Sequence, residues 1–453
     1  MEYKNKKALV IGMAKSGVSS AALLCRLGAD VTIYDVKTRE NIPQELLLEL
    51  DEYPCHDMLG KDPTDIVSSM DFLVLSPGVP LGLPFIRRAY ELGKPVIAEI
   101  ELGFSVSKAD FIAITGTNGK TTTTALTGEI FKNAGIPTHV LGNIGVPITQ
   151  EAMETKSGDV VVAETAALQL DTIENYRPCE SAILNITEDH LDRYGTMENY
   201  IAAKAKIFKN QGTEDFCVLN YDNEIVRELA DKIRAKVFWF STMQQKIENG
   251  ASVRDGMIIF SNDGNETKIL PADEVRIPGR HNLENALAAT TLACLYGISA
   301  EVIAETLRSF PGVEHRIEFV KEVNGVSFIN DSKGTNPDAT INAIHAMTKP
   351  TVLILGGYDK KNDFVPLFQS FTPMIKAVLV LGDTSKKIID AAQACGYENY
   401  IKANGFEDAI LKAYSIAEAG ENVLLSPACA SWDMFKNFEE RGRVFKDIVK
   451  GLS

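Results

Sequence analysis

One stretch in the first third of the chain restricts its fold more than any other. A β-branched run, Ile112–Thr115, leads into the glycine-containing segment Gly116–Thr122, and a helix-like pattern follows. Strand, glycine loop, Lys-Thr and helix, in this order, are the layout of a phosphate-binding loop in an α/β domain. Glycines let backbone N–H groups face phosphate oxygens, and the helix N-terminus adds positive potential.

The residue types in this loop predict a nucleotide triphosphate site. Lys120 would neutralise the terminal phosphates, and the Thr121 hydroxyl would bind Mg²⁺. The spelling departs from G-x-x-x-x-G-K-[ST], because Ile114 stands where the first glycine is expected. The alternative is an ordinary Gly-Lys turn on an α/β loop. The residues predicted to hold the nucleotide are Gly116, Thr117, Asn118, Gly119, Lys120, Thr121 and Thr122.

Length and pattern predict three α/β domains, because 453 residues exceed what one core accommodates. Strand and helix patterns alternate through residues 1–100, again through 101–309 around the glycine loop, and again through 310–453. We therefore expect a Rossmann-like N-terminal domain, a central P-loop ATPase domain and a C-terminal Rossmann-like domain.

Charge and cysteine usage exclude some classes of protein. A net charge of −15 argues against a general nucleic-acid binder, which needs a basic face. No apolar run is long enough to span a bilayer. The basic start and Ala8–Ala14 superficially resemble a secretory signal, but Lys15 interrupts the run, so we expect a strand and turn. Seven scattered cysteines suit a reducing cytoplasm.

The N-terminal stretch reads as a βαβ unit with a ligand edge. Asp35 closes the second strand, where dinucleotide folds place a ribose-binding acid. Ala14 replaces the middle glycine of the G-x-G-x-x-G pattern, which favours a related nucleotide or a nucleotide-sugar over NAD. Ser76 begins a turn after the strand Asp71–Leu75, at the edge where such sheets bind ligands. The alternative for this turn is a plain Pro-Gly connection.

Three positions in the central stretch are candidates for metal or phosphate chemistry. Glu164 closes the strand Asp159–Ala163, where a P-loop fold places a Mg²⁺-holding or water-positioning acid. His190 lies in a polar loop beyond the strand Ser181–Asn185 and is either a ligand or a capping or core histidine. Lys204 lies on a helix-like segment, where lysines usually form a solvated face, and nothing in the pattern singles it out.

The rest of the central stretch changes character. Short β-like runs at 236–240, 256–260 and 267–270 predict an antiparallel edge added to the central sheet. His281, Asn282 and Asn285 then open an alanine-rich helix, either as caps or facing a ligand.

The C-terminal stretch predicts a second site. Four predicted strands each end in a polar or glycine turn, and parallel strands share one carboxyl edge, so the turns should converge on one crevice. These strands are Val326–Asn330, Thr351–Leu355, Ala377–Leu381 and Asn422–Leu425.

Together these stretches resemble the Mur ligase family of ATP-dependent amide-bond-forming enzymes. The matching motifs run in the family's order through nearly the whole chain, and the last one points to the branch that adds D-glutamate. They are Thr115–Thr121, Gly142–Gly145, Asn185–His190, Gly279–Asn285, His315-Arg316, Asn330–Asn336 and Leu425–Ser431 through Phe435–Gly442.

The resemblance implies an acid–amino-acid ligase of cytoplasmic peptidoglycan precursor synthesis, acting as a monomer. It would join D-glutamate to UDP-N-acetylmuramoyl-L-alanine (UDP-MurNAc-L-Ala) while ATP becomes ADP and phosphate. The alanine carboxylate would attack the γ-phosphate, the amine of D-glutamate would attack the acyl phosphate, and the domains would close to exclude water.

The resemblance also implies roles for individual residues. Thr121 and Glu164 would hold one Mg²⁺, and His190 would help hold a second, bridged by a carbamylated Lys204. With Lys120 and Lys333 these form the expected catalytic set. Asn282, Asn285, Arg316 and Asp331 would approach the nucleotide with Lys333. Thr335, Lys360, Ser431 and Phe438 would receive D-glutamate, and Asp35, Ser76 and Asn143 would face the UDP-sugar.

One segment departs from the family pattern. After Glu164 similar ligases usually carry Ser-Ser-Phe-Gln-Leu, whereas this chain has Thr165-Ala-Ala-Leu-Gln-Leu170. The rival enzymes are a folylpolyglutamate synthase-like ligase or a Mur ligase for another amino acid. The rival from another class is a nucleotide-dependent regulator without ligase chemistry.

Overall fold

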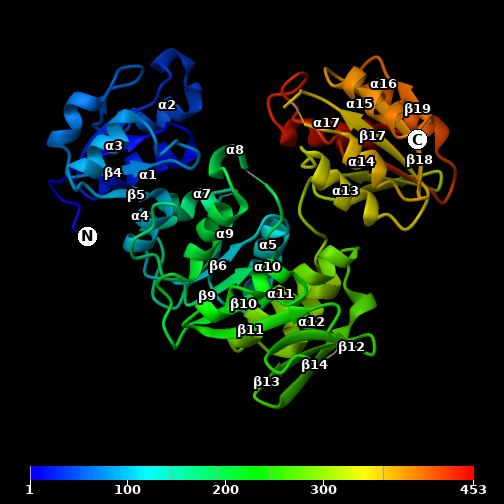
Figure 1. Ribbon diagram of the computed structural model, residues 1–453, viewed down its shortest axis with the longest axis horizontal. Coiled ribbons are helices and arrows are strands. Elements are labelled where there is room, and N and C mark those ends of the chain that lie inside the picture. Colours follow the sequence, from blue (N-terminus) through cyan, green and yellow to red (C-terminus); the bar gives the residue numbers. More distant parts are fainter. Residues whose placement is uncertain (1, 144, 190, 245, 361, 453) are drawn as a thin grey trace. The chain divides into compact units, whose positions relative to one another are not determined.

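The computed structural model describes residues 2–143, 145–189, 191–244, 246–360 and 362–452. Within these residues, three α/β domains with sheets of 5, 9 and 6 strands confirm the predicted fold class (Figure 1). The chain forms two compact units, one of Met1–Glu274 with Glu284–Arg308, the other of Val275–Leu283 with Ser309–Ser453. The domain limits near residues 100 and 309 stay predictions. Among the described helices, none is both long enough and apolar enough to cross a membrane.

The N-terminal sheet is parallel in the order β3-β2-β1-β4-β5. Alternate residues of β1 face opposite sides, as strands buried on both faces require. Ala8 and Val10 pack with α1, α2 and α4, while Leu9 and Ile11 pack with α3. The elements are β1 (Lys7–Ile11), α1 (Lys15–Arg26), β2 (Asp30–Tyr34), α2 (Gln44–Leu50), β3 (His56–Asp57), β4 (Phe72–Leu75), α3 (Pro84–Glu91), β5 (Val96–Ala98) and α4 (Glu99–Val106).

The central sheet has the order β14-β13-β12-β11-β10-β9-β6-β8-β7. Its strands are β6 (Asp110–Thr115), β7 (Thr138–Gly142), β8 (Val160–Glu164), β9 (Glu180–Ile183), β10 (Phe216–Asn220), β11 (Lys236–Ser241), β12 (Gly250–Arg254), β13 (Met257–Asn262) and β14 (Asn265–Pro271). Its helices are α5 (Lys120–Asn133), α6 (Ile148–Glu151), α7 (Ala167–Leu170), α8 (Leu191–Tyr194), α9 (Met197–Ala205), α10 (Glu224–Arg227), α11 (Arg280–Leu295) and α12 (Ala300–Ser309).

The antiparallel edge is smaller than the sequence predicts. Strand β11, expected in that edge, pairs parallel with β10, and β12 pairs parallel with β11. Only the pairs β12–β13 and β13–β14 are antiparallel. Direction is set by the connections between strands, and residue composition alone does not reveal it.

The C-terminal sheet has the order β15-β16-β20-β17-β18-β19, with β15 antiparallel to β16 and the other pairs parallel. In β17, Leu353 and Leu355 pack on one side, and Val352 and Ile354 pack with α16 and α17 on the other. The elements are β15 (Glu318–Val323), β16 (Val326–Asn330), α13 (Pro337–His345), β17 (Thr351–Gly356), α14 (Val365–Gln369), β18 (Ile375–Leu381), α15 (Ser385–Ala394), β19 (Tyr400–Lys402), α16 (Phe406–Ile416), β20 (Asn422–Leu425) and α17 (Phe438–Gly451).

Candidate functional site

The predicted loop lies between β6 and α5, as the strand–loop–helix pattern requires. Gly116 has a φ of 155° and Gly119 a φ of 84°, conformations that favour glycine. A Cβ on Gly119 would lie 2.4 Å from Oδ1 of Asn285, so this position also lacks space for a side chain. The short form of the loop therefore turns tightly at two glycines, and Ile114 remains a buried strand residue.

The loop is braced from the end of the neighbouring strand β9. The backbone N–H of Asn118 donates to Oδ1 of Asn185 over 2.8 Å, and Nδ2 of Asn185 donates back to the carbonyl oxygen of Asn118 over 3.1 Å. The N–H of Thr117 donates to the Asn185 carbonyl oxygen over 2.9 Å. The sequence placed Asn185 at the end of a strand and at the start of a motif, and the structure shows that its side chain holds the shape of the loop.

Two lysines meet at one carbonyl oxygen of the loop. Nζ of Lys120 donates to the Gly116 oxygen over 2.9 Å, and Nζ of Lys204 donates to the same oxygen over 2.7 Å. Lys204 is 1% exposed and its Nζ lies 4.6 Å from the centre of the Tyr200 ring. Burial, and then the charge of Lys120, lower the pKa of Lys204 well below its ordinary value. Reading Lys204 as part of a solvated face is therefore wrong.

The predicted metal ligands are partly described. Glu164 ends β8 in a buried position, and Nδ2 of Asn143 donates to its Oε1 over 3.1 Å. Thr121 stands in the first turn of α5 and is 9% exposed. His190 lies outside the described residues. Among the described residues no group of three His, Cys, Asp or Glu side chains is arranged to hold a metal.

The segment that departs from the family pattern forms α7 and the turn before it. Oε1 of Gln169 accepts a hydrogen bond from the Ala166 N–H over 2.9 Å. Gln169 therefore caps the start of α7, where Ala166 has no hydroxyl group to do so. The Thr165 hydroxyl donates to the Ala163 oxygen over 3.4 Å and is buried. The side chain of the buried Gln169 is thus hydrogen-bonded to the backbone at the start of its own helix.

In the N-terminal domain, Asp35 and Ser76 bracket the turn Gly12–Gly17. Asp35 accepts from the Met13 N–H over 2.7 Å, and the Ser76 hydroxyl donates to the Gly12 oxygen over 2.6 Å. A Cβ on Gly17 would lie 1.8 Å from that same oxygen. The close approach of turn and helix therefore depends on Gly17, while Ala14 is accommodated before α1.

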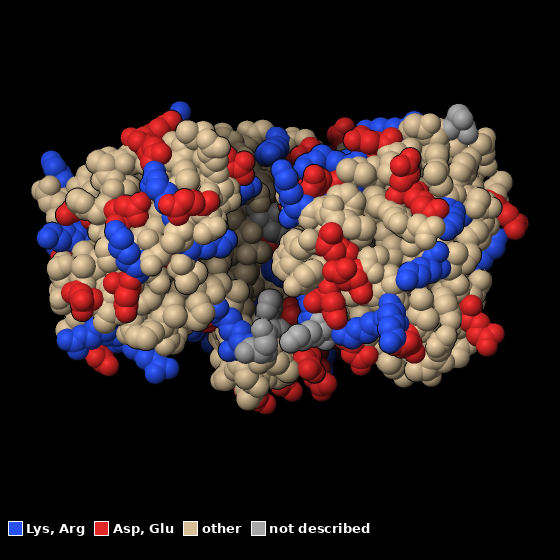
Figure 2. Space-filling model, turned by 90° about the horizontal axis from the view of Figure 1, so that it is seen from above, with Lys and Arg blue, Asp and Glu red and all other residues tan. Residues whose placement is uncertain are grey.

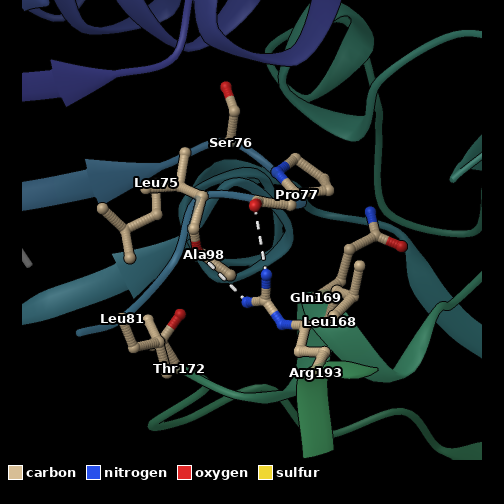
Figure 3. Close-up of a pocket in the computed structure, with 11 residues that line it drawn as sticks. Leu75, Ser76, Pro77, Leu81, Ala98, Leu168, Gln169, Thr172 and Arg193 are labelled. Atoms are coloured by element: carbon tan, nitrogen blue, oxygen red, sulfur yellow. Dashed lines mark hydrogen bonds between the residues drawn. The ribbon is translucent and has the colours of Figure 1, made fainter. Parts of the chain in front are cut away.

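Arg193, which the sequence analysis passed over, joins the Ser76 turn to the central domain (Figure 3). Its Nη1 donates to the Gly78 oxygen over 3.0 Å and its Nη2 to the Val79 oxygen over 3.1 Å. Ser76, Gln169 and Arg193 line one pocket. The signal in the sequence was an arginine just after the polar loop that holds His190, but nothing there indicated the partner.

The first residues of α11 belong to different compact units, those up to Leu283 to the second unit and those from Glu284 to the first. Asn285 accepts from the Thr123 hydroxyl over 3.1 Å and belongs with the glycine loop. Asn282 donates to the Pro278 oxygen over 2.7 Å, so its side chain makes a local contact in the second unit. His281, also in that unit, has its pKa lowered to about 4 by burial and by the charge of Arg316.

In the C-terminal unit the predicted convergence of turns is confirmed. Asp331, after β16, accepts from the Ser426 hydroxyl, after β20, over 2.6 Å. The Gly356 N–H, ending β17, donates to the Pro427 oxygen over 2.9 Å, and the Thr384 hydroxyl, after β18, donates to the Gly357 oxygen over 3.0 Å. Four strand ends are therefore tied into one edge.

Two groups at this edge have unusual electrostatics. Burial raises the pKa of the Asp331 carboxyl to about 6, although the Ser426 hydrogen bond opposes the rise. Nε of Arg316 is buried and has no hydrogen-bond partner among the described residues. A buried donor of this kind can donate to an oxygen atom of a ligand or of a water molecule.

The residues predicted for the amino acid lie around the same edge. Nζ of Lys333 is 5.6 Å from the centre of the Phe438 ring, which begins α17. Nζ of Lys360 is 4.8 Å from the centre of the Trp432 ring, next to the buried Ser431. Burial, and then the charge of Arg441, lower the pKa of Lys360. Thr335 lies two residues beyond Lys333, and its N–H donates to the Lys333 oxygen over 2.8 Å.

Arg441 holds these turns together and was not singled out in the sequence. It is 1% exposed and donates to the backbone oxygens of Ser332, Cys429 and Ala430 over 2.7–3.3 Å, and to the Ser332 hydroxyl over 3.0 Å. Burial lowers its pKa to about 10, so it keeps its charge at neutral pH. Its place in the motif Phe435–Gly442 was the available signal.

Charges on the face shown in Figure 2 are mixed, with groups of Lys and Arg lying beside groups of Asp and Glu. The expectation that the protein is not a general nucleic-acid binder stays a prediction from the net charge of −15.

Three family descriptions match successive parts of the chain: "Mur ligase MurD-like, N-terminal domain" over residues 6–98, "Mur ligase middle domain" over 114–293, and "Mur ligase, glutamate ligase domain" over 315–429. Two curated relatives, each a UDP-N-acetylmuramoylalanine–D-glutamate ligase, match all of the chain over all of their own length. They are 48% identical, from Alkaliphilus oremlandii, and 47% identical, from Clostridioides difficile.

Solved structures show the same fold at low identity. The UDP-N-acetylmuramate-alanine ligase MurC of Thermotoga maritima has a TM-score of 0.61 at 21% identity, covering 98% of this chain and 99% of that one. A pseudomurein peptide ligase type C of Methanothermus fervidus has a TM-score of 0.60 at 20% identity, covering the same shares.

Proposed function

The chain belongs to the Mur ligase family, and we infer from this that it is the ATP-dependent ligase that adds D-glutamate to UDP-MurNAc-L-Ala in peptidoglycan synthesis. The observation that carries this conclusion is the full-length match to ligases of that name at nearly half identity. The reaction forms an amide from a carboxylate and an amine, and ATP supplies the leaving group by phosphorylating the carboxylate.

We propose that the loop Gly116–Thr122 binds the ATP phosphates. Two glycines with positive φ and the N-terminus of α5 direct N–H groups and positive potential to one place. Lys120 now donates to the oxygens of Gly116 and Thr117, over 2.9 Å each, and a γ-phosphate offers its ammonium a charged acceptor instead. As negative charge spreads over the transferred phosphoryl group, Lys120 stabilises it.

The donor set near the loop fits Mg²⁺. A hard cation takes carboxylate and hydroxyl oxygens together with phosphate oxygens and water, and the buried Glu164 and Thr121 are oxygen donors of this kind. When bound, the ion would offset charge on the phosphoryl oxygens. A second ion, with His190 as a ligand, belongs to the same proposal.

We further propose that Lys204 is carbamylated. The reaction joins the neutral amine to CO₂ and releases one proton, so it needs an amine whose pKa is low. Burial and the neighbouring Lys120 lower the pKa of Lys204, which supports a neutral amine. A charged Lys204 would be repelled by the ammonium of Lys120, which donates to the same carbonyl oxygen, whereas a carbamate on Lys204 would attract it.

In the C-terminal unit we propose a site for D-glutamate with Lys333 and Asp331 near the nucleotide. Lys360 supplies a counter-charge for a carboxylate, and Thr335, Ser431 and Phe438 line the place. Nε of Arg316, which has no hydrogen-bond partner in the part of the chain that the structure describes, supports a nucleotide contact beside Asp331. Asn282 and Asn285 are also proposed to contact the nucleotide. Asp35, Ser76 and Asn143 are proposed to face the UDP-sugar.

The proposal extends to a monomer acting in the cytoplasm. All seven cysteines are free, which accords with a reducing compartment. ATP and the UDP-linked precursor are small anions, and a positively charged loop at a helix N-terminus recruits them in spite of the overall negative charge.

One assay tests the function. Purified protein is mixed with ATP, Mg²⁺ and UDP-MurNAc-L-Ala, and ADP release is followed with D-glutamate, L-lysine, diaminopimelate or L-alanine. We expect ADP release with D-glutamate alone, and a product heavier than the precursor by one glutamyl residue. Release with another amino acid would identify a sister ligase, and ATP binding without amino-acid-dependent release would indicate a regulator.

A further inference from the structure

Arg193 makes a two-point contact between the two domains of the first unit. Its guanidinium donates to two successive carbonyl oxygens, of Gly78 and Val79, over 3.0 and 3.1 Å. These oxygens belong to the turn that follows β4 and begins at Ser76. Figure 3 shows the guanidinium directed at this turn from the α8 side. Two parallel bonds from a planar group set both the distance and the orientation of the turn.

The guanidinium of Arg193 also lies beside a carboxylate of the central domain. Asp171, just after α7, is 10% exposed in its side chain and lies 3.9 Å from Nη2 of Arg193. The Tyr194 hydroxyl donates to Asp171 over 3.2 Å, and Nζ of Lys206 lies 3.7 Å from its other oxygen. Asp171 therefore ties α8 to α7, and burial raises the pKa of its carboxyl.

The two ends of this contact lie near residues proposed to bind different substrates, the UDP-sugar and ATP. The turn end holds Ser76, whose hydroxyl closes the Gly12–Gly17 turn. At the other end, Arg193 lies three residues after His190, in the stretch that begins at Asn185, which braces the loop Gly116–Thr122. A pocket lined by Ser76, Gln169 and Arg193 lies between them.

We propose that Arg193 is a positioning residue that sets the turn beginning at Ser76, which faces the UDP-sugar, relative to the loop Gly116–Thr122, which binds ATP. In this way it places the alanine carboxylate for attack on the γ-phosphate. This inference rests on the proposed function. A turn that is no longer held in place makes poorer contacts with the UDP-sugar, so the affinity for this substrate falls. A carboxylate misplaced by about 1 Å also reacts about a hundredfold more slowly. A lysine ammonium has three N–H donors on a single nitrogen but lacks the planar fork of the guanidinium, so it only partly replaces the two-point contact.

The test compares Arg193→Ala and Arg193→Lys with the wild type in the ADP-release assay. For Arg193→Ala we expect the KM for UDP-MurNAc-L-Ala to rise about tenfold or more, with the KM values for ATP and D-glutamate within about twofold. The KM of Arg193→Lys for UDP-MurNAc-L-Ala should lie between the values of the wild type and Arg193→Ala. Calorimetric titration of UDP-MurNAc-L-Ala alone should show the same order of affinities.

Arg227→Ala is the matched control. Arg227 also donates to a backbone oxygen, that of Tyr221 over 2.8 Å, and stacks on its ring, but both partners lie in the central domain. An unchanged KM for UDP-MurNAc-L-Ala in Arg193→Ala, or an equal rise in all three KM values, overturns the inference. Failure of the wild type to release ADP with D-glutamate would overturn the proposed function instead, so the two failures are distinct.

Discussion

At the scale of single residues, chemistry depends on surroundings that the side chain's own type does not reveal. Lys120 and Lys204 both donate to the oxygen of Gly116, but Lys120 is part of the loop whereas Lys204 reaches it from a helix 84 positions further along the chain. The role of Lys120 was predictable from a motif, whereas Lys204 is distinguished only by its burial. Substitution of each lysine tests its proposed role.

Lys120→Ala should reduce ligation by at least about a hundredfold, because the charge that stabilises the transferred phosphoryl group is lost. The fold should persist, since this ammonium donates to the oxygens of Gly116 and Thr117 within its own loop. ADP release measures the first expectation and circular dichroism the second. Lys132→Ala, at an exposed position near the end of the same helix, is the control and should behave as wild type. Near-normal turnover in Lys120→Ala would refute the loop assignment.

Lys204→Ala should be inactive and partly rescued by a short-chain carboxylic acid, because the acid supplies the anionic oxygens that a carbamate would provide. Activity is assayed over a series of acid concentrations, with Lys209→Ala, at an exposed lysine nearby, as the control. Wild-type activity without the acid would remove the carbamate proposal.

At the scale of elements, α4 connects the N-terminal sheet to the central domain through two buried carboxylates. Oε1 of Glu99 accepts from the N–H and the hydroxyl of Thr149, over 2.8 and 2.9 Å. Glu101 accepts from three backbone N–H groups, of residues 174–176. The other oxygen of Glu99 is buried and has no partner among the described residues, and burial raises the pKa of Glu99 to about 7.

The raised pKa gives stability a specific pH dependence. The folded state binds this proton more tightly than the unfolded chain, whose ordinary value is 4.5. The contribution of Glu99 to the free energy of unfolding is therefore complete below pH 4.5 and falls, by roughly 3 kcal/mol, as pH rises to about 7. The Glu99→Gln variant should lack this pH dependence. The difference in free energy of unfolding between the variant and the wild type should therefore favour the variant more at pH 8 than at pH 5.

Thermal unfolding of both proteins at the two pH values measures this effect. Glu101→Gln is the comparison, because it weakens three backbone hydrogen bonds and should destabilise at both pH values. An identical pH response in the wild type and Glu99→Gln would show that another group dominates.

At the scale of the whole molecule, the chain has two compact units, and multi-unit proteins depart from a single two-state transition. We expect calorimetry to resolve at least two unfolding transitions. ATP with Mg²⁺ should raise one of them, because a ligand stabilises the unit that binds it. Adding ATP and Mg²⁺ to the Lys120→Ala variant should leave the temperature of that transition unchanged. One transition with equal calorimetric and van't Hoff enthalpies would contradict this expectation.

The sequence by itself determined the α/β class, the loop at Gly116–Thr122 and the family, because strand and helix periods, glycine positions and motif order are local properties of the chain. It also predicted the convergence of the C-terminal turns, since parallel strands share an edge. It misjudged the direction of β11 and the environment of Lys204.

Only the tertiary structure decided what depends on distant partners. Arg193 meets Gly78 and Val79 across more than a hundred positions, and Arg441 meets Ser332 in the same way. The partners are backbone carbonyl oxygens, which every residue carries, so no residue type in the sequence marks them. Burial likewise decided the pKa of Lys204 and Glu99, because desolvation depends on everything packed around a group.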